Sequence, residues 1–524
     1  MTDYNLKITD YNLNTASKGR ADFSSLVSEL FIRAELQPNA AAMIDGDYVL
    51  TYGQFRLAVE RLARGLFARG VRPGDRIALH LRNIPELAIT YYACMHTGII
   101  AAPLNTRYKA PEMERLLRRL QPALYIGQAD LYNSIAALDH SILAADRRFL
   151  VDEPMEEAST QGWDTLLDDV GTSPVGTFQD ADAPTMLLPT SGSTGEPKFV
   201  VHTARTLLAM VSLFKEVHFV RDDVALAVTP IVHMSGVMTL MATLGAGATL
   251  VLMHQFEPAL ALDLIERRRC TLLKGLPITY AGLIEQQRVR ERTVNSLRCC
   301  LVGGDVPPPG LQDEFLSLFG VRLRNVMAMT EAVGTFTYGF PNGPVCRVVD
   351  RDWVRLVSQD GATARRGETG EIALRGPNVF AGYWLGVDQL DTGRKQGWFY
   401  TGDLAVEDEE GSFWFVGRSK NFIVRGDSKI SPIEVEQALL NHPAVRDAVV
   451  VGVPDPVLGE KVLGVVQLAD HPTDALLDEI LHCVSRQVSD YKVPERLIVV
   501  PQIPRNSLGK VDRKVALQTI DATL

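Results

Sequence analysis

Pro189-Thr190-Ser191-Gly192-Ser193-Thr194-Gly195-Glu196-Pro197-Lys198 is a polar stretch between two apolar runs, residues 185–188 and residues 199–201. The pattern predicts a strand, a glycine-containing loop and a second strand. Small residues let backbone N–H groups approach phosphate oxygens, and the four hydroxyls and the lysine of this stretch suit the shell around a polyanion. A flexible surface hairpin is the alternative interpretation. The spacing is not the Walker pattern, because Lys198 follows a proline and no helix obviously starts there.

The composition limits the class of protein. A chain of 524 residues is too long for one ordinary core and predicts about three packing units. A hydrophobic content of 46% and a charged content of 22% are typical of a globular protein. The formal net charge of -10 disfavours nucleic acid as the main partner. The six cysteines lack C-x-x-C spacing, so neither a zinc site nor a disulfide framework is expected.

The hydropathy of the chain points to a cytoplasmic location. The N-terminal residues lack the apolar core of a signal peptide, and the most apolar stretch, residues 87–103, is interrupted by polar, glycine and proline residues. We therefore expect no membrane span. The sequence leaves open whether the protein is a monomer or a homodimer.

Helical and strand patterns alternate along the first three fifths of the chain. Apolar residues at helical spacing between residues 55 and 67 precede an apolar strand pattern at 76–80, and the same order recurs at 85–104 and 111–126. Such alternation predicts doubly wound α/β layers. Small or polar residues end several of the strands, as in Gly303-Gly304-Asp305. Ligands bind outside the carboxyl ends of parallel strands, so these ends are the expected walls of one cleft.

The change of helix and strand patterns along the chain predicts an α/β protein with two domains. Residues 1–24 are interpreted as an N-terminal tail, and residues 25–418 as a large domain built from two doubly wound α/β subdomains and a β-barrel-like subdomain. The third subdomain is predicted from valine-rich alternating runs at about 344–418. Residues 421–524 are expected to form a small, mobile α+β domain.

Four motifs that are far apart in the sequence occur in this order: the Ser/Thr/Gly loop, Thr330-Glu331, Tyr400-Thr401-Gly402-Asp403-Leu404 and Pro504-Arg505-Asn506-Ser507-Leu508-Gly509-Lys510. Together they resemble the motifs of the adenylate-forming superfamily, which includes acyl-CoA synthetases, firefly-type luciferases and peptide-synthetase adenylation domains. The resemblance runs from about residue 25 to residue 518 and is closest to stand-alone acyl- or aryl-CoA synthetases. It implies an ATP-dependent acid–thiol ligase that uses ATP, Mg2+ and coenzyme A.

The resemblance also implies a role for each motif. The carboxylate attacks the α-phosphorus of ATP and expels pyrophosphate, so the site must screen two anions. The loop is implied to hold the β- and γ-phosphates, Thr330 to contact the α-phosphate and Glu331 to bind Mg2+. Asp403 is implied to accept hydrogen bonds from the ribose hydroxyls. The full implied nucleotide and CoA set is Thr190, Ser191, Gly192, Ser193, Thr194, Lys198, Gly303, Gly304, Asp305, Met327, Ala328, Asp403, Arg418, Gly426 and Lys429.

Lys510 is implied to be the catalytic lysine, whose ammonium contacts the carboxylate and the α-phosphate in the transition state. Taken alone, it would be an ordinary charge on a terminal tail. Because it belongs to the small domain, that domain must close for adenylation and rotate away before the thiol attacks. The motif places the hinge at residues 419–420, with Lys420 as the pivot. His233 matches the family position that gates the acyl and pantetheine tunnel, although a lone histidine is often structural.

The chain departs from the family pattern at five positions. Phe199 stands where the family has glycine after the loop lysine, and Met327 and Ala328 replace the aromatic residue that stacks on adenine and its neighbouring glycine. Asp427 and Cys346 replace two further glycines. Asp427 lies in the loop where the thiol enters in the family, which keeps a carrier-protein thiol open as the alternative acceptor to CoA.

The expected acid pocket is apolar. The segment around His233 lacks the aspartate that amino-acid adenylation domains use to bind the substrate ammonium, and the neighbouring residues offer no obvious cation for a second carboxylate. We therefore expect a hydrophobic monocarboxylic acid, either aromatic or medium-chain. A nucleotide-binding regulator without catalysis is a third interpretation, which the presence of the charged motif residues disfavours. The pocket is expected to comprise His233, Met234, Val237, Met329, Val333 and Phe336.

Overall fold

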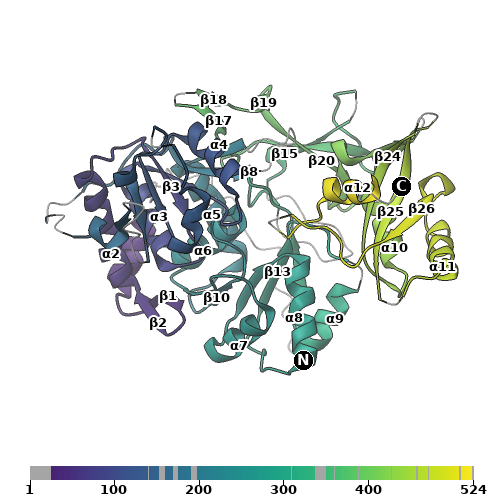
Figure 1. Cartoon of the computed structure of the whole chain (residues 1–524), viewed down its shortest axis with the longest axis horizontal. Helices are drawn as coiled ribbons and strands as arrows, with labels where there is room; N and C mark the ends of the chain where they lie inside the picture. The colour runs from purple at the N-terminus through teal and green to yellow at the C-terminus, as the bar shows by residue number, and fades with distance from the viewer. Residues whose placement is uncertain are drawn as a thin grey trace.

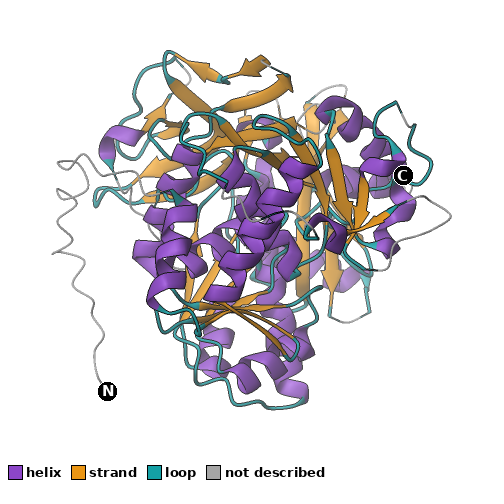
Figure 2. Cartoon of the chain, turned by 90° about the vertical axis from the view of Figure 1, so that its left-hand side faces the viewer, coloured by secondary structure: helices purple, strands orange, loops and turns teal. Residues whose placement is uncertain are grey.

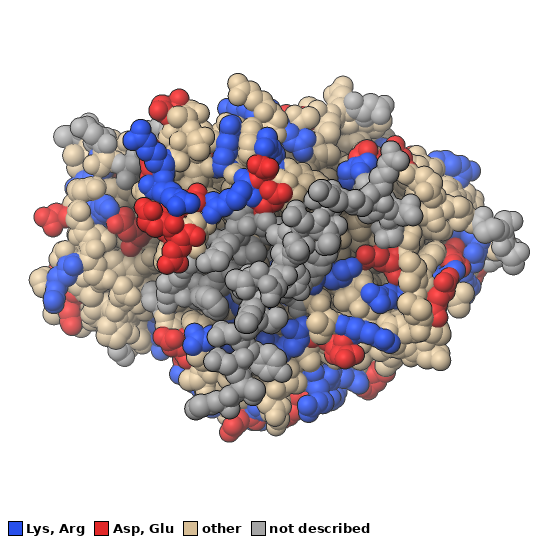
Figure 3. Space-filling model, turned by 180° about the vertical axis from the view of Figure 1, so that it is seen from behind, with Lys and Arg blue, Asp and Glu red and all other residues tan. Residues whose placement is uncertain are grey.

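The computed structural model describes most of the chain, and every structural statement below refers to that part. It covers residues 25–521 except 140, 153–159, 169–170, 172–174, 191–197, 309, 337–349, 359, 388, 426–427, 456–457, 470 and 507–508, and it describes only the backbone of residues 216–218, 429, 520 and 521. Among the described helices, none combines the length and the apolar character that a membrane-spanning segment requires. On the face shown in Figure 3, Lys and Arg side chains are interspersed with Asp and Glu.

Two large sheets form the first part of the molecule (Figure 1). The nine-stranded sheet has the order β18 (Gln389–Asp391), β17 (Gly382–Gly386), β9 (Lys198–Thr203), β8 (Pro184–Thr190), β4 (Ile100–Pro103), β3 (Arg76–His80), β5 (Leu124–Gly127), β6 (Arg148–Leu150) and β7 (Gln161–Gly162). The seven-stranded sheet has the order β14 (Leu323–Val326), β13 (Cys299–Gly303), β12 (Leu272–Gly275), β10 (Val224–Ala227), β11 (Thr249–Leu252), β1 (Ala41–Asp45) and β2 (Tyr48–Thr51). Most neighbouring strands are parallel, as the alternating pattern predicts.

Helices pack on both faces of these sheets, which confirms the doubly wound α/β prediction (Figure 2). One layer shares a core with strands of both sheets, and it comprises α1 (Leu26–Leu36), α2 (Tyr52–Ala68), α3 (Pro85–Thr97), α5 (Ala204–His218) and α6 (Met234–Ala246). On the outer faces, α4 (Ala110–Leu120) covers the nine-stranded sheet, and α7 (Pro258–Arg268), α8 (Pro277–Val289) and α9 (Leu311–Phe319) cover the seven-stranded sheet.

Local sequence signals set the ends of these helices. Thr51 accepts a hydrogen bond from the backbone N–H of Gln54, and the Gln54 side chain accepts one from the backbone N–H of Thr51, so the two form a capping box at the start of α2. Pro85 begins α3, and Gly98 ends it with a left-handed φ of 74°. These ends fix where each following strand begins.

The β-rich segment forms an antiparallel sheet. Its sheet comprises β15 (Val354–Val357), β16 (Thr369–Leu374), β20 (Trp398–Glu407), β19 (Arg394–Lys395) and β21 (Phe413–Arg418). The β17–β18 hairpin departs from this subdomain and extends the nine-stranded sheet, because β17 pairs with β9. Trp384 lies opposite Phe199 in that pairing, and both side chains are buried in one core. The hairpin therefore joins the β-rich part to β9 of the nine-stranded sheet.

The C-terminal part is an α+β domain with its own cores, which confirms a large N-terminal and a small C-terminal domain. Its elements are β22 (Ile423–Arg425), β23 (Ser428–Ile430), α10 (Pro432–Leu440), β24 (Val445–Asp455), β25 (Gly459–Leu468), α11 (Asp474–Ser485), β26 (Arg496–Val499) and α12 (Arg513–Asp521). The sequence patterns missed the β22–β23 hairpin and α12. Short 3-10 helices complete the described chain at Ala129–Ser134, Ala145–Arg147, Trp163–Leu166, Arg351–Trp353, Ser419–Asn421 and Asp490–Lys492.

Gly65 marks a close contact on which the packing of α2 depends. A Cβ at Gly65 would lie 1.6 Å from the backbone oxygen of Leu166. Gly65→Ala is therefore expected to destabilise the protein by roughly 1–3 kcal/mol or more, because backbone must move to admit the methyl group. Chemical denaturation of both proteins measures the change.

Gly176→Ala is the matched control, because a Cβ there would meet no atom within 4 Å and the backbone needs no positive φ. An equal midpoint for Gly65→Ala and the wild type would show that the contact at Leu166 relaxes without cost.

Candidate active site

The Lys510 ammonium lies within the electrostatic reach of residues from the large domain. The charges of Arg418, Asp305, Asp403 and Glu331 all act on it. A Cβ placed on Gly304 would lie 3.5 Å from Lys510 Cε and 3.8 Å from Lys510 Nζ. The structure thus brings the lysine from the small domain to the end of β13, beside the predicted nucleotide-binding residues.

A tight loop in the small domain holds Lys510 in this position. The Lys510 backbone N–H donates to Asn506 Oδ1 at 3.1 Å, and the Asn506 N–H donates to the Lys510 carbonyl at 2.8 Å. Arg505 donates to the Gly509 carbonyl at 3.0 Å, and Gly509 has a left-handed φ of 78°. A Cβ on Gly509 would lie 3.3 Å from Leu276 Cδ1, so this loop rests against the large domain. Glycine at 509 satisfies both the turn and the close approach.

Electrostatics at Lys510 favour an anionic ligand. Burial lowers the pKa of Lys510, and the charge of Arg418 lowers it further, whereas Asp305, Asp403 and Glu331 act in the opposite direction. A ligand with several negative charges would offset the desolvation of the ammonium and the repulsion from Arg418. The arrangement can therefore stabilise developing negative charge.

Glu331 is held by a residue that the sequence analysis did not name, Tyr383 on β17. The Tyr383 hydroxyl donates to Glu331 Oε1 at 2.9 Å, and the Lys198 ammonium lies 4.8 Å from the centre of the Tyr383 ring. Burial raises the pKa of the Glu331 carboxyl, and the bond from Tyr383 opposes that shift. Tyr383 therefore connects the end of the polar loop to the predicted metal ligand.

Thr330 and Glu331 lie in a turn rather than directly at a strand end. β14 ends at Val326, and an isolated bridge pairs Met329 with Ala332 across the turn. The Thr330 carbonyl is bonded to His202 Nε2 at 2.9 Å, and the Glu331 carbonyl accepts from the Phe380 N–H at 2.8 Å. These bonds turn the chain toward His202 on β9 and toward Phe380, which precedes β17.

Asp403 and Arg418 face each other across the antiparallel strands β20 and β21. Arg418 Nε donates to Asp403 Oδ1 at 2.7 Å, and only 5% of the Asp403 surface is exposed. Burial raises the pKa of Asp403, and the Arg418 guanidinium opposes this. The bond leaves Asp403 Oδ2 to accept from a ligand hydroxyl.

A narrow cavity adjoins Asp403. Its walls are mostly apolar and come from the turn after β14 and from strands β16 and β20. These walls place apolar side chains next to the buried Asp403 carboxylate. The lining residues are Met327, Ala328, Met329, Ala332, Thr335, Phe336, Ile372, Leu374, Thr401 and Asp403.

The predicted acid pocket is divided by the fold. Met234, Val237 and Val333 belong to the core between the two large sheets. Met329 and Phe336 instead line the cavity beside Asp403 and pack against the β-rich core. The structure therefore groups three of the predicted pocket residues and places two beside Asp403, the predicted ribose ligand.

His233 is the N-cap residue of α6 and lies near Lys510. Burial lowers the pKa of His233 to about 4, and the charges of Lys510 and Arg107 contribute to this shift. The imidazole is therefore neutral at neutral pH and adds no further positive charge beside the lysine.

Lys420 lies in the short helix Ser419–Asn421 between β21 and β22. Ser431 Oγ donates to the Val416 carbonyl at 2.6 Å, which joins the two parts across this segment. The assignment of Lys420 as a hinge stays a prediction.

Several predicted residues lie outside the described part of the chain, namely Ser191, Gly192, Ser193, Thr194, Cys346, Gly426 and Asp427, and the side chain of Lys429 is likewise not described.

The carboxylates of the site suit a metal ion whose remaining ligands come from a bound phosphate compound. No group of three or more His, Cys, Asp or Glu side chains in the described residues could hold a metal ion. Glu331 is a hard oxygen donor, and Mg2+ is commonly held by one or two carboxylates together with phosphate oxygens. Glu331 would thus hold Mg2+ with the phosphates of ATP, and the metal would supply charge neutralisation there.

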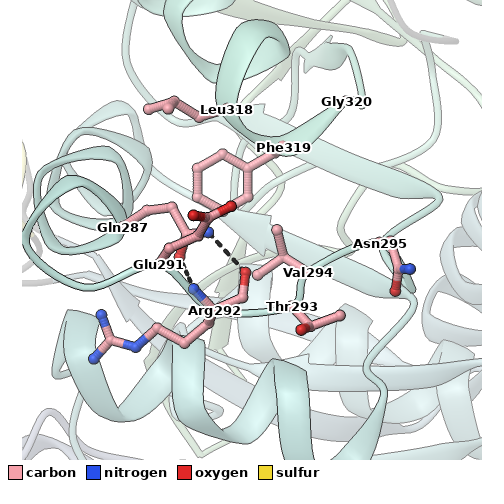
Figure 4. Close-up of a pocket in the computed structure, with 9 residues that line it drawn as sticks. All are labelled: Gln287, Glu291, Arg292, Thr293, Val294, Asn295, Leu318, Phe319 and Gly320. Carbon is pink, nitrogen blue, oxygen red and sulfur yellow. Dashed lines mark hydrogen bonds between the residues drawn. The ribbon is translucent and has the colours of Figure 1, made fainter.

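A second cavity, of about 570 Å³, lies away from these residues (Figure 4). It is formed by the ends of α8 and α9 and the loop that leads into β13, and the Gln287 side chain and the Arg292 backbone bond each other beside it. Because it precedes β13 and β14, it lies at the amino ends of these strands. The candidate active site lies at their carboxyl ends.

Models of a known protein family match most of the chain. The family description "AMP-binding enzyme" matches residues 30–384, and "AMP-binding enzyme C-terminal domain" matches residues 434–510. Feruloyl-CoA synthase from Amycolatopsis sp is 34% identical over 498 residues, which are 91% of this chain and 96% of that protein. Indoleacetate–CoA ligase from Aromatoleum aromaticum is 31% identical over 506 residues, 93% of this chain and 96% of that protein. The structure of o-succinylbenzoate CoA synthetase from Bacillus subtilis with ATP and magnesium matches with a TM-score of 0.78 and 27% identity, covering 93% of this chain and 98% of that one.

Tyr383→Phe is expected to lower kcat/KM for ATP about 5- to 10-fold, because Glu331 loses one hydrogen bond while the ring beside Lys198 remains. Pyrophosphate exchange measures this effect. Tyr132→Phe, which removes a hydroxyl bonded to Arg148 in another core, is the control and should leave kcat/KM unchanged. Equal activity of Tyr383→Phe and wild type would contradict a role in positioning Glu331.

The raised pKa values of Glu331 and Asp403 predict weak nucleotide binding in acid. As pH falls, these carboxyls are protonated at a higher pH than usual, so KM for ATP should rise. Because Mg2+ binds the ionised carboxylate, more Mg2+ should move this acid limb to lower pH. Pyrophosphate exchange between pH 5 and 8 at two Mg2+ concentrations, chosen as about a tenfold difference, tests this.

Glu331→Gln is the matched control, because its side chain has no proton to lose. An acid limb that stays at one pH at both Mg2+ concentrations in the wild type would show that Glu331 does not bind the metal.

Proposed function

The chain belongs to the AMP-binding enzyme family, and from this premise we propose that it adenylates a hydrophobic monocarboxylic acid and transfers the acyl group to coenzyme A. It is an AMP-forming acid–thiol ligase that uses ATP, Mg2+ and CoA. The proposed acid is aromatic or medium-chain. Relatives named for ferulate, indoleacetate and medium-chain fatty acids support this range.

The position of Lys510 is the observation that carries the proposal. Its ammonium lies beside Gly304 and within electrostatic reach of Asp403 and Glu331. With ATP bound by these residues, the ammonium would act on the acid carboxylate and the α-phosphate together. Charge on the pentacovalent α-phosphorus would then develop in a site that is already arranged to stabilise it.

The second half-reaction requires a different arrangement. Gly509, next to Lys510, approaches Leu276 of the large domain closely, so the C-terminal loop occupies the rim of the site. A thiol that attacks the acyl-adenylate needs room at this rim. We propose that the small domain rotates about Lys420 and withdraws Lys510 before the thiol enters.

A pyrophosphate-release screen over aromatic, medium-chain, dicarboxylic and amino acids tests the substrate class. Aromatic or medium-chain monocarboxylates are expected to drive release, and mass spectrometry should then show an acyl-CoA product. Release driven only by amino acids or dicarboxylates would overturn the proposed acid. Acyl transfer to a carrier-protein thiol but not to CoA would overturn the proposed acceptor.

Lys510→Ala is expected to slow adenylation by about 100-fold or more while sparing thiolation of a supplied acyl-adenylate. Each half-reaction is measured separately, with Lys514→Ala as the control because that lysine is exposed on α12. Equal loss of both half-reactions in Lys510→Ala would contradict the proposed rotation.

A further inference from the structure

A second lysine, Lys274 on β12, is buried within the large domain. Only 7% of its surface is exposed, and its ammonium lies 4.6 Å from the centre of the Phe214 ring on α5. Leu272, two positions earlier on the strand, belongs to the core between the two large sheets, as does Phe214. Side chains two positions apart share a face of a strand, so Lys274 points into that same core.

The Lys274 ammonium has no counter-charge among the described residues, and no described atom forms a hydrogen bond or an ion pair with it. Burial alone lowers its pKa to about 8, so the group is still mostly protonated at neutral pH. An unpaired buried charge is costly, and one aromatic face compensates it only in part. No described protein atom therefore satisfies the hydrogen-bond donors of this ammonium.

Lys274 stands two residues before Leu276, the residue against which the Lys510 loop rests. In extended chain, residues 274 and 276 share a face, with their Cα atoms about 7 Å apart. The Leu276 side chain is the one that approaches Gly304 and Gly509. Lys274 is paired with Leu301 on β13, two residues before Gly303. The C-terminal end of β12 therefore leads from Lys274, in the core, to Leu276, which contacts the Lys510 loop.

Helix α5 connects Lys274 to the other wall of the site. Leu213, next to Phe214, packs against the segment that follows Glu331, since a Cβ on Gly334 would lie 2.8 Å from Leu213 Cβ. Met234, Val237 and Val333 lie in the same core as Phe214. These contacts place an apolar core between Lys274 and the segment that follows Glu331.

We propose that Lys274 forms the end of the acid pocket remote from Lys510 and binds an oxygen acceptor, such as a phenolic hydroxyl or a ketone, on the far end of the substrate. The inference rests on the proposed function, because it concerns the same acid. The sequence analysis expected no cation in the acid pocket, and this inference changes that expectation. Lys274 was not recognised because it lies in an ordinary strand pattern without a motif. The substrate class becomes a hydrophobic monocarboxylic acid with an oxygen at its distal end.

Two matched pairs of acids test this inference: 4-hydroxycinnamate with 4-methylcinnamate, and 7-oxooctanoate with octanoate. The wild type is expected to prefer the oxygen-bearing acid in at least one pair by about tenfold or more in kcat/KM for pyrophosphate release. Lys274→Met should lose about 10- to 100-fold for that acid and little for its apolar partner. Leu273→Met, on the opposite face of the same strand, is the control and should keep the wild-type preference.

Thermal unfolding gives an independent measurement. Lys274→Met should be at least as stable as the wild type without ligand, because methionine fills similar space without a buried charge. If Lys274→Met folds poorly, Lys274→Gln replaces it in the kinetic comparison of the paired acids. Glutamine keeps a hydrogen-bond donor but carries no charge.

The outcomes separate this inference from the proposed function. An equal preference in the wild type and in the Lys274 variants, or a wild-type preference for the apolar acid in both pairs, would overturn the inference and leave the ligase activity standing. Failure of every acid in the wider panel to release pyrophosphate would overturn the proposed function and this inference with it.

Discussion

The central constraint on this protein is the placement of an ammonium group from one domain among the acidic and basic groups of another. Lys510 is half-buried next to Gly304 and experiences the charges of Arg418, Asp403 and Glu331. Burial makes each of these charges more costly, which is why the carboxyl pKa values rise and the lysine pKa falls. A ligand that brings both anionic phosphates and a divalent cation relieves these opposing costs at once.

The β-rich subdomain contributes to this constraint through its position more than through its own core. The β17–β18 hairpin leaves the β-rich sheet to pair with β9, and this pairing carries Tyr383 between Lys198 and Glu331. On the other side, β20 and β21 align Asp403 with Arg418. The same subdomain thus orients the predicted metal ligand and the predicted ribose ligand, so a shift of either strand pair would disturb both.

The sequence predicted the layered fold and the main charged residues because both leave local signals. Alternating helix and strand patterns, capped helices such as α2 and glycine-ended helices such as α3 can be recognised within short windows. The motifs located Glu331, Asp403 and Lys510. Tyr383 was missed because its role depends on a strand pairing between distant segments, and the Gly382-Tyr383-Trp384 run carried no chemical signal of its own. The division of the expected acid pocket was missed because Met329 and Phe336 turn into the β-rich core through contacts that no local pattern encodes.

Lys274 shows how a buried strand can conceal specificity. In the run Leu272-Leu273-Lys274-Gly275, one charged residue interrupts an apolar strand, and by sequence alone it reads as a residue near a strand end. The parallel pairing of β12 with β13 and the packing of α5 place the ammonium in the core instead. Catalysis and selection of the acid would then depend on two lysines with different surroundings. Lys510 experiences several charges and would leave with its domain in the proposed rotation, whereas Lys274 is fixed in the sheet and would gain a hydrogen-bond partner when the acid binds.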